Sequence, residues 1–149
     1  MDFDPKVRDR IINVLNSQKI AVLGTSKEDE PYSCLVSFAF TEDLKKIVFA
    51  TMRQRLKYQN MIANPRVTLI IDNRDVYNSD FNDTTSITVV GTANDIKDEE
   101  RLKYASLLID RHPTLADFVN SPDCAVMKVE IDRYYVVSEF ESVVKFGAN

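Results

Sequence analysis

The stretch FATMRQRLKYQNMIANPRVTLIID, Phe49–Asp72, decides how the rest of the sequence is interpreted. An apolar, strand-like run ends at Thr51, a segment with helical spacing follows at 54–63, and a second apolar run occupies 66–72. Four cations surround this short helix: Arg53, Arg55, Lys57 and Arg66. They form either the solvated face of a helix or a binding site for a small anion.

The composition is that of a globular protein. The 149 residues are 44% hydrophobic and 28% charged, which suits one domain with its own core, and we expect a single domain over 1–149. A net charge of -4 argues against a general nucleic-acid-binding surface. No run reaches the roughly 18 apolar residues of a membrane span. The N-terminal MDFDPKVRDR has no signal-peptide core. We therefore expect a cytoplasmic protein that binds neither nucleic acid nor membrane.

The sequence offers few residues for metal or triad chemistry. Cys34 and Cys124 match no metal-ligand spacing, so we expect reduced structural thiols and no metal site. The single histidine, His112, would have to serve alone in any Ser-His-Asp scheme, and its place in RHPT between two predicted helices favours a polar loop residue. With only three glycines there is no Gly-rich phosphate loop. Any nucleotide must be held by side chains and helix termini.

Hydrophobic periodicity predicts about seven strands and three or four helices. The first helix has Asp4 as N-cap and Pro5 at its first helical position. Gly91, inside a strand, predicts a bulge or a close backbone approach, and Thr114 with Asp117 resembles a capping box. The pattern lacks a βαβ rhythm, which points to a small antiparallel β-barrel or an α+β fold. The expected strands are 19–25, 32–40, 45–51, 66–72, 86–96, 124–131 and 134–140; the expected helices are 4–16, 54–63, 97–111 and 114–120, with a polar loop at 73–83.

Two features favour an anion or nucleotide site near the helix at 54–63. A helix N-terminus exposes unpaired N–H groups and partial positive charge, so it accepts a phosphate readily. Arg55 and Lys57 lie near this end, and guanidinium binds phosphate in a bidentate way whereas ammonium acts as a point charge. The strand at 32–40 alternates so that small or partly polar residues share one face, which lets a flat ligand approach its backbone. These residues are Ser33, Leu35, Ser37 and Ala39.

The order of these motifs resembles that of the FMN-binding split-barrel superfamily, the pyridoxamine 5′-phosphate oxidase-like proteins. The shared pattern is an apolar strand ending in Thr, a Ser-Arg-Lys-like cluster, a helix, and NPRV opening the next strand. EPYSCLVSFAF is similar to the family's second strand, SITVVGTANDIKDEER to a later strand with a glycine, and YASLLIDRHPTLADF to its helix-Pro-helix segment. The resemblance covers roughly residues 10 to 140. It implies a mainly β fold, an antiparallel split barrel of six to seven strands.

The resemblance also implies FMN as the cofactor and assigns residues to it. Thr51 would lie beside the flavin and Lys57 would contact its phosphate. Arg55 and Leu56 fall at the Ser-Arg pair of the signature. Leu56 therefore replaces the family's arginine, and Arg55 would supply the charge from the neighbouring position. Arg53 adds to the same local positive charge.

Further assignments concern the second strand and the partner subunit. The oxidase has a phosphate-binding arginine near Ser33 or Cys34, which this chain lacks, and Ser33 and Ser37 offer only hydroxyls. Ser86 falls where the oxidase has a polar residue that contacts the flavin from the partner subunit. The resemblance therefore implies a homodimer with the flavin site at its interface, in keeping with strands that are apolar on both faces.

The leading functional hypothesis is an FMN-binding oxidoreductase acting on an unknown small molecule. The residues identify no catalytic acid or base. Pyridoxamine 5′-phosphate oxidation itself is not expected, because the sequence ends in FESVVKFGAN without that enzyme's C-terminal Arg/His-bearing substrate segment. One alternative is a reductase that uses the deazaflavin F420, which would need a more extended basic groove. The others are a non-catalytic flavin or haem carrier, for which His112 is nearly the only imidazole ligand, and a cofactor-free split barrel.

Overall fold

Seven antiparallel strands dominate the computed structural model, which describes residues 3–74, 84–138 and 142–147. The polar loop predicted at 73–83 lies largely outside the described residues. The first five strands begin and end within two residues of the predicted positions. The strands are β1 (Ile20–Lys27), β2 (Glu30–Phe40), β3 (Lys46–Met52), β4 (Arg66–Asp72), β5 (Ser86–Asp95), β6 (Cys124–Ser138) and β7 (Ser142–Gly147).

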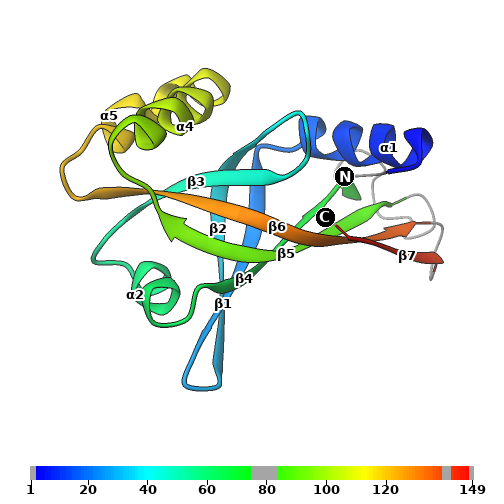
Figure 1. Cartoon of the computed structure of the whole chain (residues 1–149), viewed down its shortest axis with the longest axis horizontal. Coiled ribbons are helices and arrows are strands. Elements are labelled where there is room, and N and C mark those ends of the chain that lie inside the picture. The colour runs from blue at the N-terminus through cyan, green and yellow to red at the C-terminus, as the bar shows by residue number, and fades with distance from the viewer. Residues whose placement is uncertain (1–2, 75–83, 139–141, 148–149) are drawn as a thin grey trace.

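The first six strands close into a barrel (Figure 1). Neighbours follow the order β3-β2-β1-β4-β5-β6-β7, and an additional pairing of β3 with β6 joins the two ends of the six-stranded part. This closing ladder runs from Lys46 opposite Glu130 to Met52 opposite Cys124. β7 extends the sheet beyond β6. The prediction of a mainly β, six- to seven-stranded antiparallel split barrel is confirmed.

Strand β6 corrects the prediction of two final strands at 124–131 and 134–140. It is one strand of 15 residues that continues to Ser138. Its register against β5 shifts between Val90 and Gly91, whose partners are Arg133 and Ile131, so Asp132 has no partner in the ladder. A β-bulge of this kind inserts one residue while pairing resumes on both sides. The polar Asp132-Arg133 pair therefore marks a bulge and not the end of the strand.

The barrel interior holds most of the core. Along β1, β4 and most of β5, buried and more exposed residues alternate, because successive side chains point to opposite faces of a sheet. Tyr134 is fully buried, and its hydroxyl donates a 2.8 Å hydrogen bond to the Leu44 carbonyl. Burial raises the pKa of Tyr134 well above its ordinary value, so it stays neutral and serves as a core residue.

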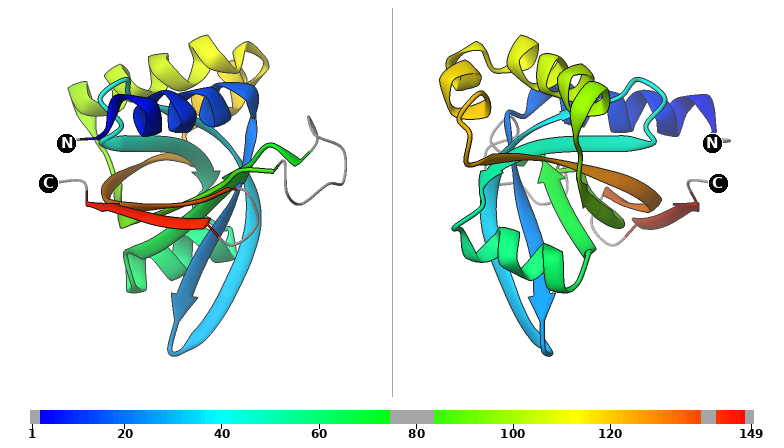
Figure 2. Two further views of the ribbon diagram at one scale, coloured as in Figure 1. Left: turned by 90° about the vertical axis from the view of Figure 1, so that its right-hand side faces the viewer. Right: turned by 60° about the vertical axis from the view of Figure 1, so that its left-hand side comes forward.

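The helices cover different parts of the barrel (Figures 1 and 2). The described helices are α1 (Pro5–Ser17), α2 (Leu56–Ala63), α4 (Asp98–Arg111) and α5 (Ala116–Val119), with a 3₁₀ turn at Pro113–Leu115. Helix α1 packs its apolar stripe into the barrel core, and the Asp4 carboxylate accepts a 2.8 Å hydrogen bond from the N–H of Lys6, as predicted. Helix α4 covers the outside of β2, β3 and β6 through a second core cluster. None of the described helices is long and apolar enough to cross a membrane.

One local prediction near α4 and α5 is wrong. No side-chain hydrogen bond caps the 3₁₀ turn or α5, so Thr114 and Asp117 do not form a capping box. His112 lies in the connection between the helices, as predicted, and its side chain is buried there. Its Nε2 lies 2.7 Å from the Phe38 carbonyl oxygen, which attaches the end of α4 to β2.

The prediction of a bulge or close approach at Gly91 is confirmed on both counts. A Cβ atom at this position would lie 2.3 Å from the Glu130 carbonyl oxygen and 2.7 Å from a Val129 methyl carbon. The first neighbour is backbone and cannot rotate away. Glycine is therefore required here by space, where β5 and β6 pass closely beside the bulge.

We expect Gly91→Ala to lower the free energy of unfolding by roughly 1–3 kcal/mol, because the added methyl group forces β5 and β6 apart. Urea unfolding of the two proteins measures the difference. Gly147→Ala is the matched control, since a Cβ there meets no atom within 4 Å. Equal stability of wild type and Gly91→Ala would contradict the close approach.

Candidate functional site

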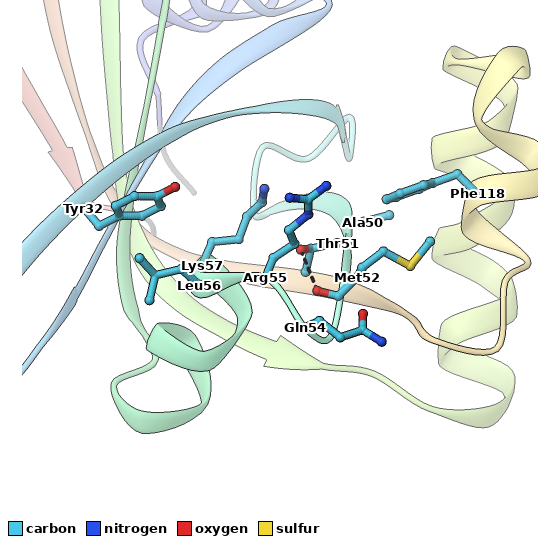
Figure 3. A pocket seen from close by; sticks show the side chains of 9 residues that line it. All are labelled: Tyr32, Ala50, Thr51, Met52, Gln54, Arg55, Leu56, Lys57 and Phe118. Atoms are coloured by element: carbon cyan, nitrogen blue, oxygen red, sulfur yellow. Dashed lines mark hydrogen bonds between the residues drawn. The ribbon is translucent and has the colours of Figure 1, made fainter.

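A cavity of about 410 Å³ opens between the start of α2 and α5 (Figure 3). Three separate segments form it: the start of β2, the β3–α2 connection, and α5. Four predicted site residues, from the end of β3 and the first turn of α2, lie together here. The lining consists of Tyr32, Ala50, Thr51, Met52, Gln54, Arg55, Leu56, Lys57 and Phe118.

The structure separates the four cations of the Phe49–Asp72 stretch into two pairs. Arg66 forms an ion pair with Asp132 and hydrogen bonds to the Thr92 hydroxyl, on the barrel surface. Arg53 forms an ion pair with Asp95 at 3.4 Å and does not line the cavity. Its positive charge is offset by that carboxylate and does not add to an anion site as predicted.

Arg55 and Lys57 have no such partner. Within the described part of the chain, neither side chain forms an ion pair or a hydrogen bond. Helix α2 begins at Leu56, two residues later than predicted. Arg55 is its N-cap residue, and the Arg55 side chain makes no capping hydrogen bond. Figure 3 shows both head groups extending toward the space between Tyr32 and Phe118. The cavity therefore combines two uncompensated cations with the positive end of a helix.

Thr51 and Leu56 give the cavity a polar floor and an apolar edge. Thr51 is almost fully buried, and its hydroxyl donates a 3.1 Å hydrogen bond to the Met52 carbonyl, which leaves the oxygen lone pairs available to accept. Leu56 is half exposed. Tyr32 and Phe118, each more than a third exposed, stand on the two sides. An anionic ligand with an apolar, flat portion fits these surroundings.

The predicted residues Ser33, Ser37 and Ser86 lie elsewhere. None of them lines the cavity. Ser33 pairs with Gly24 and Ser37 with Ile20, and both serines point out of the barrel with Leu35, opposite to the buried Val36 and Phe38. Ser86 begins β5, at the end of the strand opposite to Asp95. These three serines therefore lie on the outer sheet surface, which within one chain is separate from the cations.

A smaller cavity of about 180 Å³ adjoins the first along Tyr32 and Leu56. Its lining is completed by Lys27, Glu28, Glu30 and Asn60, so its charge is mixed and more acidic than that of the first cavity.

Behind the site, burial raises the pKa of the Cys34 thiol, and the nearby Lys57 ammonium partly opposes this rise. The ammonium therefore lies close to β2.

Sequence reasoning missed the residues that complete the cavity. Tyr32 lies at the start of a strand, and Phe118 lies in a short helical segment, with no sequence pattern linking either one to the cations. Asp95, which pairs with Arg53, is 42 residues away along the chain. Only the closing of the barrel brings these segments to one place.

The sequence profile of the pyridoxamine 5′-phosphate oxidase family matches residues 7–138. The chain belongs to this family. The match spans all six barrel strands and the whole cavity. No curated protein sequence matches the chain.

Solved structures with the same fold include haem-binding or haem-storage proteins and a protein related to a general stress protein. A haem-binding protein from Mycobacterium smegmatis aligns with a TM-score of 0.86 at 14% identity, covering 99% of this chain and 60% of its own. The haem storage protein HutZ from Vibrio cholerae aligns at 0.72 and 12% identity, covering 83% and 88%. A general stress protein 26-related protein of the pyridoxinephosphate oxidase family from Clostridium acetobutylicum aligns at 0.75 and 18% identity, covering 97% and 96%. This chain thus spans about 60% of the haem-binding protein's length. At these identities the likeness shows the fold alone.

The contribution of the Arg53–Asp95 pair to the stability of the fold depends on pH. Burial alone raises the pKa of Asp95, but hydrogen bonds from Tyr58 and Lys97 and the charges of Lys97 and Arg53 outweigh it, so the pKa is lowered. A carboxyl whose pKa is lower in the folded than in the unfolded state stabilises the fold above the unfolded value, about 3.9 for Asp. That contribution is lost as the pH falls through the folded value.

We therefore expect the stability difference between wild type and Asp95→Asn to be constant above about pH 5 and to shrink below about pH 4, where the wild-type carboxylate becomes protonated. Urea unfolding of both proteins from pH 3 to pH 7 measures it. A difference that does not change over this range would show that ionised Asp95 contributes nothing.

Proposed function

We propose that the chain binds FMN in the cavity between α2 and α5 and acts as an FMN-dependent oxidoreductase on a small molecule. The observation that carries this proposal is the pair Arg55 and Lys57, which lie without acidic partners among the described residues at the N-terminus of α2 and inside the cavity. A dianionic phosphate supplies the charge that this arrangement lacks.

The rest of the cavity suits the flavin end of the same ligand. Tyr32 and Phe118 offer aromatic surfaces on either side, and the Thr51 hydroxyl offers a hydrogen-bonding group on the floor. Lys57 also brings a cation close to Cys34 on β2, where the family resemblance places an arginine that this chain lacks. When bound, FMN supplies the hydride or electron chemistry, and the protein binds and orients it. The cavity lining contains neither histidine nor carboxylate, so the proposal assigns no acid or base.

Haem is the second candidate, because two proteins of the same fold are described as binding or storing haem. An imidazole-ligated haem in this cavity is disfavoured, since His112 is buried and bonded to the Phe38 carbonyl. Met52 and Tyr32 line the cavity and belong to residue types that ligate haem iron elsewhere. Absorbance separates the candidates, because a Soret band would indicate haem.

We further propose a homodimer formed by the outer surface of β2, β1 and β4. Leu35, Val22 and Ile70 are direct cross-strand neighbours on this surface. Leu35 is 66% exposed and Ile70 38%, and Ile20 nearby is 52% exposed. These residues form an apolar row on the part of the sheet that α4 and the other described helices leave exposed, and such a row marks an association surface. A second copy seated here would face the same surface that carries Ser33, Ser37 and Ser86.

We expect purified protein to show flavin absorbance or to bind added FMN. Lys57→Ala should weaken FMN binding by about 10- to 150-fold, because it removes one charge-assisted contact worth roughly 1.5–3 kcal/mol. Titration of FMN fluorescence measures the affinity. Arg66→Ala is the control, since Arg66 is paired with Asp132 outside the cavity.

A colourless protein that FMN neither binds nor stabilises would overturn the FMN proposal and favour F420 or no cofactor. Unchanged affinity in Lys57→Ala would overturn the phosphate assignment.

For the dimer, we expect Leu35→Glu to convert a dimeric wild-type protein into a monomer, because it buries a charge in the apolar row. Light scattering after size exclusion measures the mass. Leu102→Glu is the matched control, because Leu102 is 70% exposed on α4, away from this sheet surface. A monomeric wild-type protein, or a dimer that Leu35→Glu leaves intact, would contradict the assignment.

A further inference from the structure

Asp95 is a buried carboxylate beside the cavity but not in its lining. Its side chain is only 9% exposed. The Oδ2 atom accepts hydrogen bonds from the Tyr58 hydroxyl at 2.8 Å, the Lys97 ammonium at 3.2 Å and the Arg53 guanidinium at 3.4 Å. The Oδ1 atom is buried without a partner among the described residues. Burying a carboxylate is costly, so its retention at this position calls for a role.

The donors to Asp95 belong to the segments that carry the cavity's cations. Tyr58 follows Lys57 in the first turn of α2, and Arg53 lies in the turn that leads from β3 to Arg55. The Arg53 guanidinium also donates to the carbonyls of Pro122 and Cys124, at 3.2 Å each, and lies over the Tyr58 ring. Asp95, at the end of β5, therefore fixes the β3–α2 turn to the barrel.

The opposite wall of the cavity is attached to the same point. The Arg101 guanidinium of α4 donates to the Cys124 carbonyl and to the Val119 carbonyl, at 2.9 Å each. Val119 directly follows Phe118, which forms the α5 side of the cavity. The Cys124 carbonyl thus accepts from both Arg53 and Arg101. One carbonyl at the start of β6 holds both the cationic wall and the aromatic wall.

We infer that Asp95 is a positioning residue for the anion site: through Arg53 and Tyr58 it holds Arg55 and Lys57 in the arrangement that binds a phosphate. This inference rests on the proposed FMN binding. Electrostatics and positioning predict opposite signs for the loss of Asp95. A carboxylate near an anion site repels the ligand, so removing its charge alone would tighten binding. Removing the anchor of Arg53 and Tyr58 weakens binding, because the cations lose their fixed placement.

The test compares FMN affinity in wild type, Asp95→Asn and Asp132→Asn. Asp132 is the matched control, because it also pairs with an arginine of the Phe49–Asp72 stretch, Arg66, but away from the cavity. We expect Asp95→Asn to weaken FMN binding by about tenfold. This is the lower end of the loss in metal affinity when a residue that hydrogen-bonds to a metal ligand is removed. We expect Asp132→Asn to leave it unchanged. Tighter binding in Asp95→Asn, or an equal loss in both variants, overturns the inference.

Two further measurements separate positioning from direct contact. The salt dependence of FMN binding should fall in Lys57→Ala, which loses a contact with the anion, and should stay at the wild-type value in Asp95→Asn. The effect of Asp95→Asn should shrink in a Lys57→Ala background, because residues that act through one another are not additive. Full additivity overturns the inference.

A second variant tests the inference if Asp95→Asn does not fold, and a measurement without ligand tests it if wild type does not bind FMN. If Asp95→Asn does not fold, Tyr58→Phe is tested instead, because it removes one donor to Asp95 and keeps the ring beside Arg53. Tyr58→Phe should weaken FMN binding by a smaller factor than Asp95→Asn. Unchanged affinity overturns the inference. If wild type does not bind FMN, the proposed function fails. The inference is then tested by amide hydrogen exchange at 53–58, which should be faster in Asp95→Asn than in wild type or Asp132→Asn. Equal exchange overturns it.

Discussion

The pairing of β3 with β6 is the constraint on which the rest of this structure depends. It joins strands that are more than 70 residues apart in the chain, and without it the six strands would form an open sheet. Closure brings the end of β3 beside the start of β6, and hence the first turn of α2 beside the α4–α5 segment that precedes β6. The cavity occupies this junction. Strand β6 can serve in closure because it is long and bulged, so its first part pairs with β3 and its last part with β7.

The cations of the Phe49–Asp72 stretch illustrate how tertiary structure assigns roles that spacing cannot. All four are similar in sequence terms, since each lies near one short helix. Asp95 and Asp132 neutralise Arg53 and Arg66, and both acids come from strands that follow later in the chain. What remains is a pair, Arg55 and Lys57, at the helix start. The local cluster of positive charge in this stretch therefore overstates the charge that the cavity presents.

Much of the fold could be predicted from the sequence because its signals are local. Apolar runs and, at 32–40, alternation located the first five strands, the Asp4-Pro5 pair located the start of α1, and Gly91 located the bulge. The failures occurred where long-range contacts decide the outcome. In the sequence, the polar pair Asp132-Arg133 resembles the end of a strand, and only the structure shows that Arg66 lies beside Asp132 and pairs with it. Strand β7 has no distinct sequence pattern of its own. For the site, motif order singled out Thr51, Arg55, Leu56 and Lys57, and the structure brings these four into one cavity. Tyr32, Phe118 and Asp95 became visible only in three dimensions.

The scattered origin of the cavity lining links ligand binding to folding. Its walls come from the start of β2, from the β3–α2 connection and from α5, so the cavity does not exist until the barrel has closed. A ligand seated there binds the closed barrel and not the unfolded chain. It therefore shifts the folding equilibrium by mass action, by an amount that grows with the logarithm of its free concentration above its dissociation constant. The cellular lifetime of this protein would then follow the supply of its ligand.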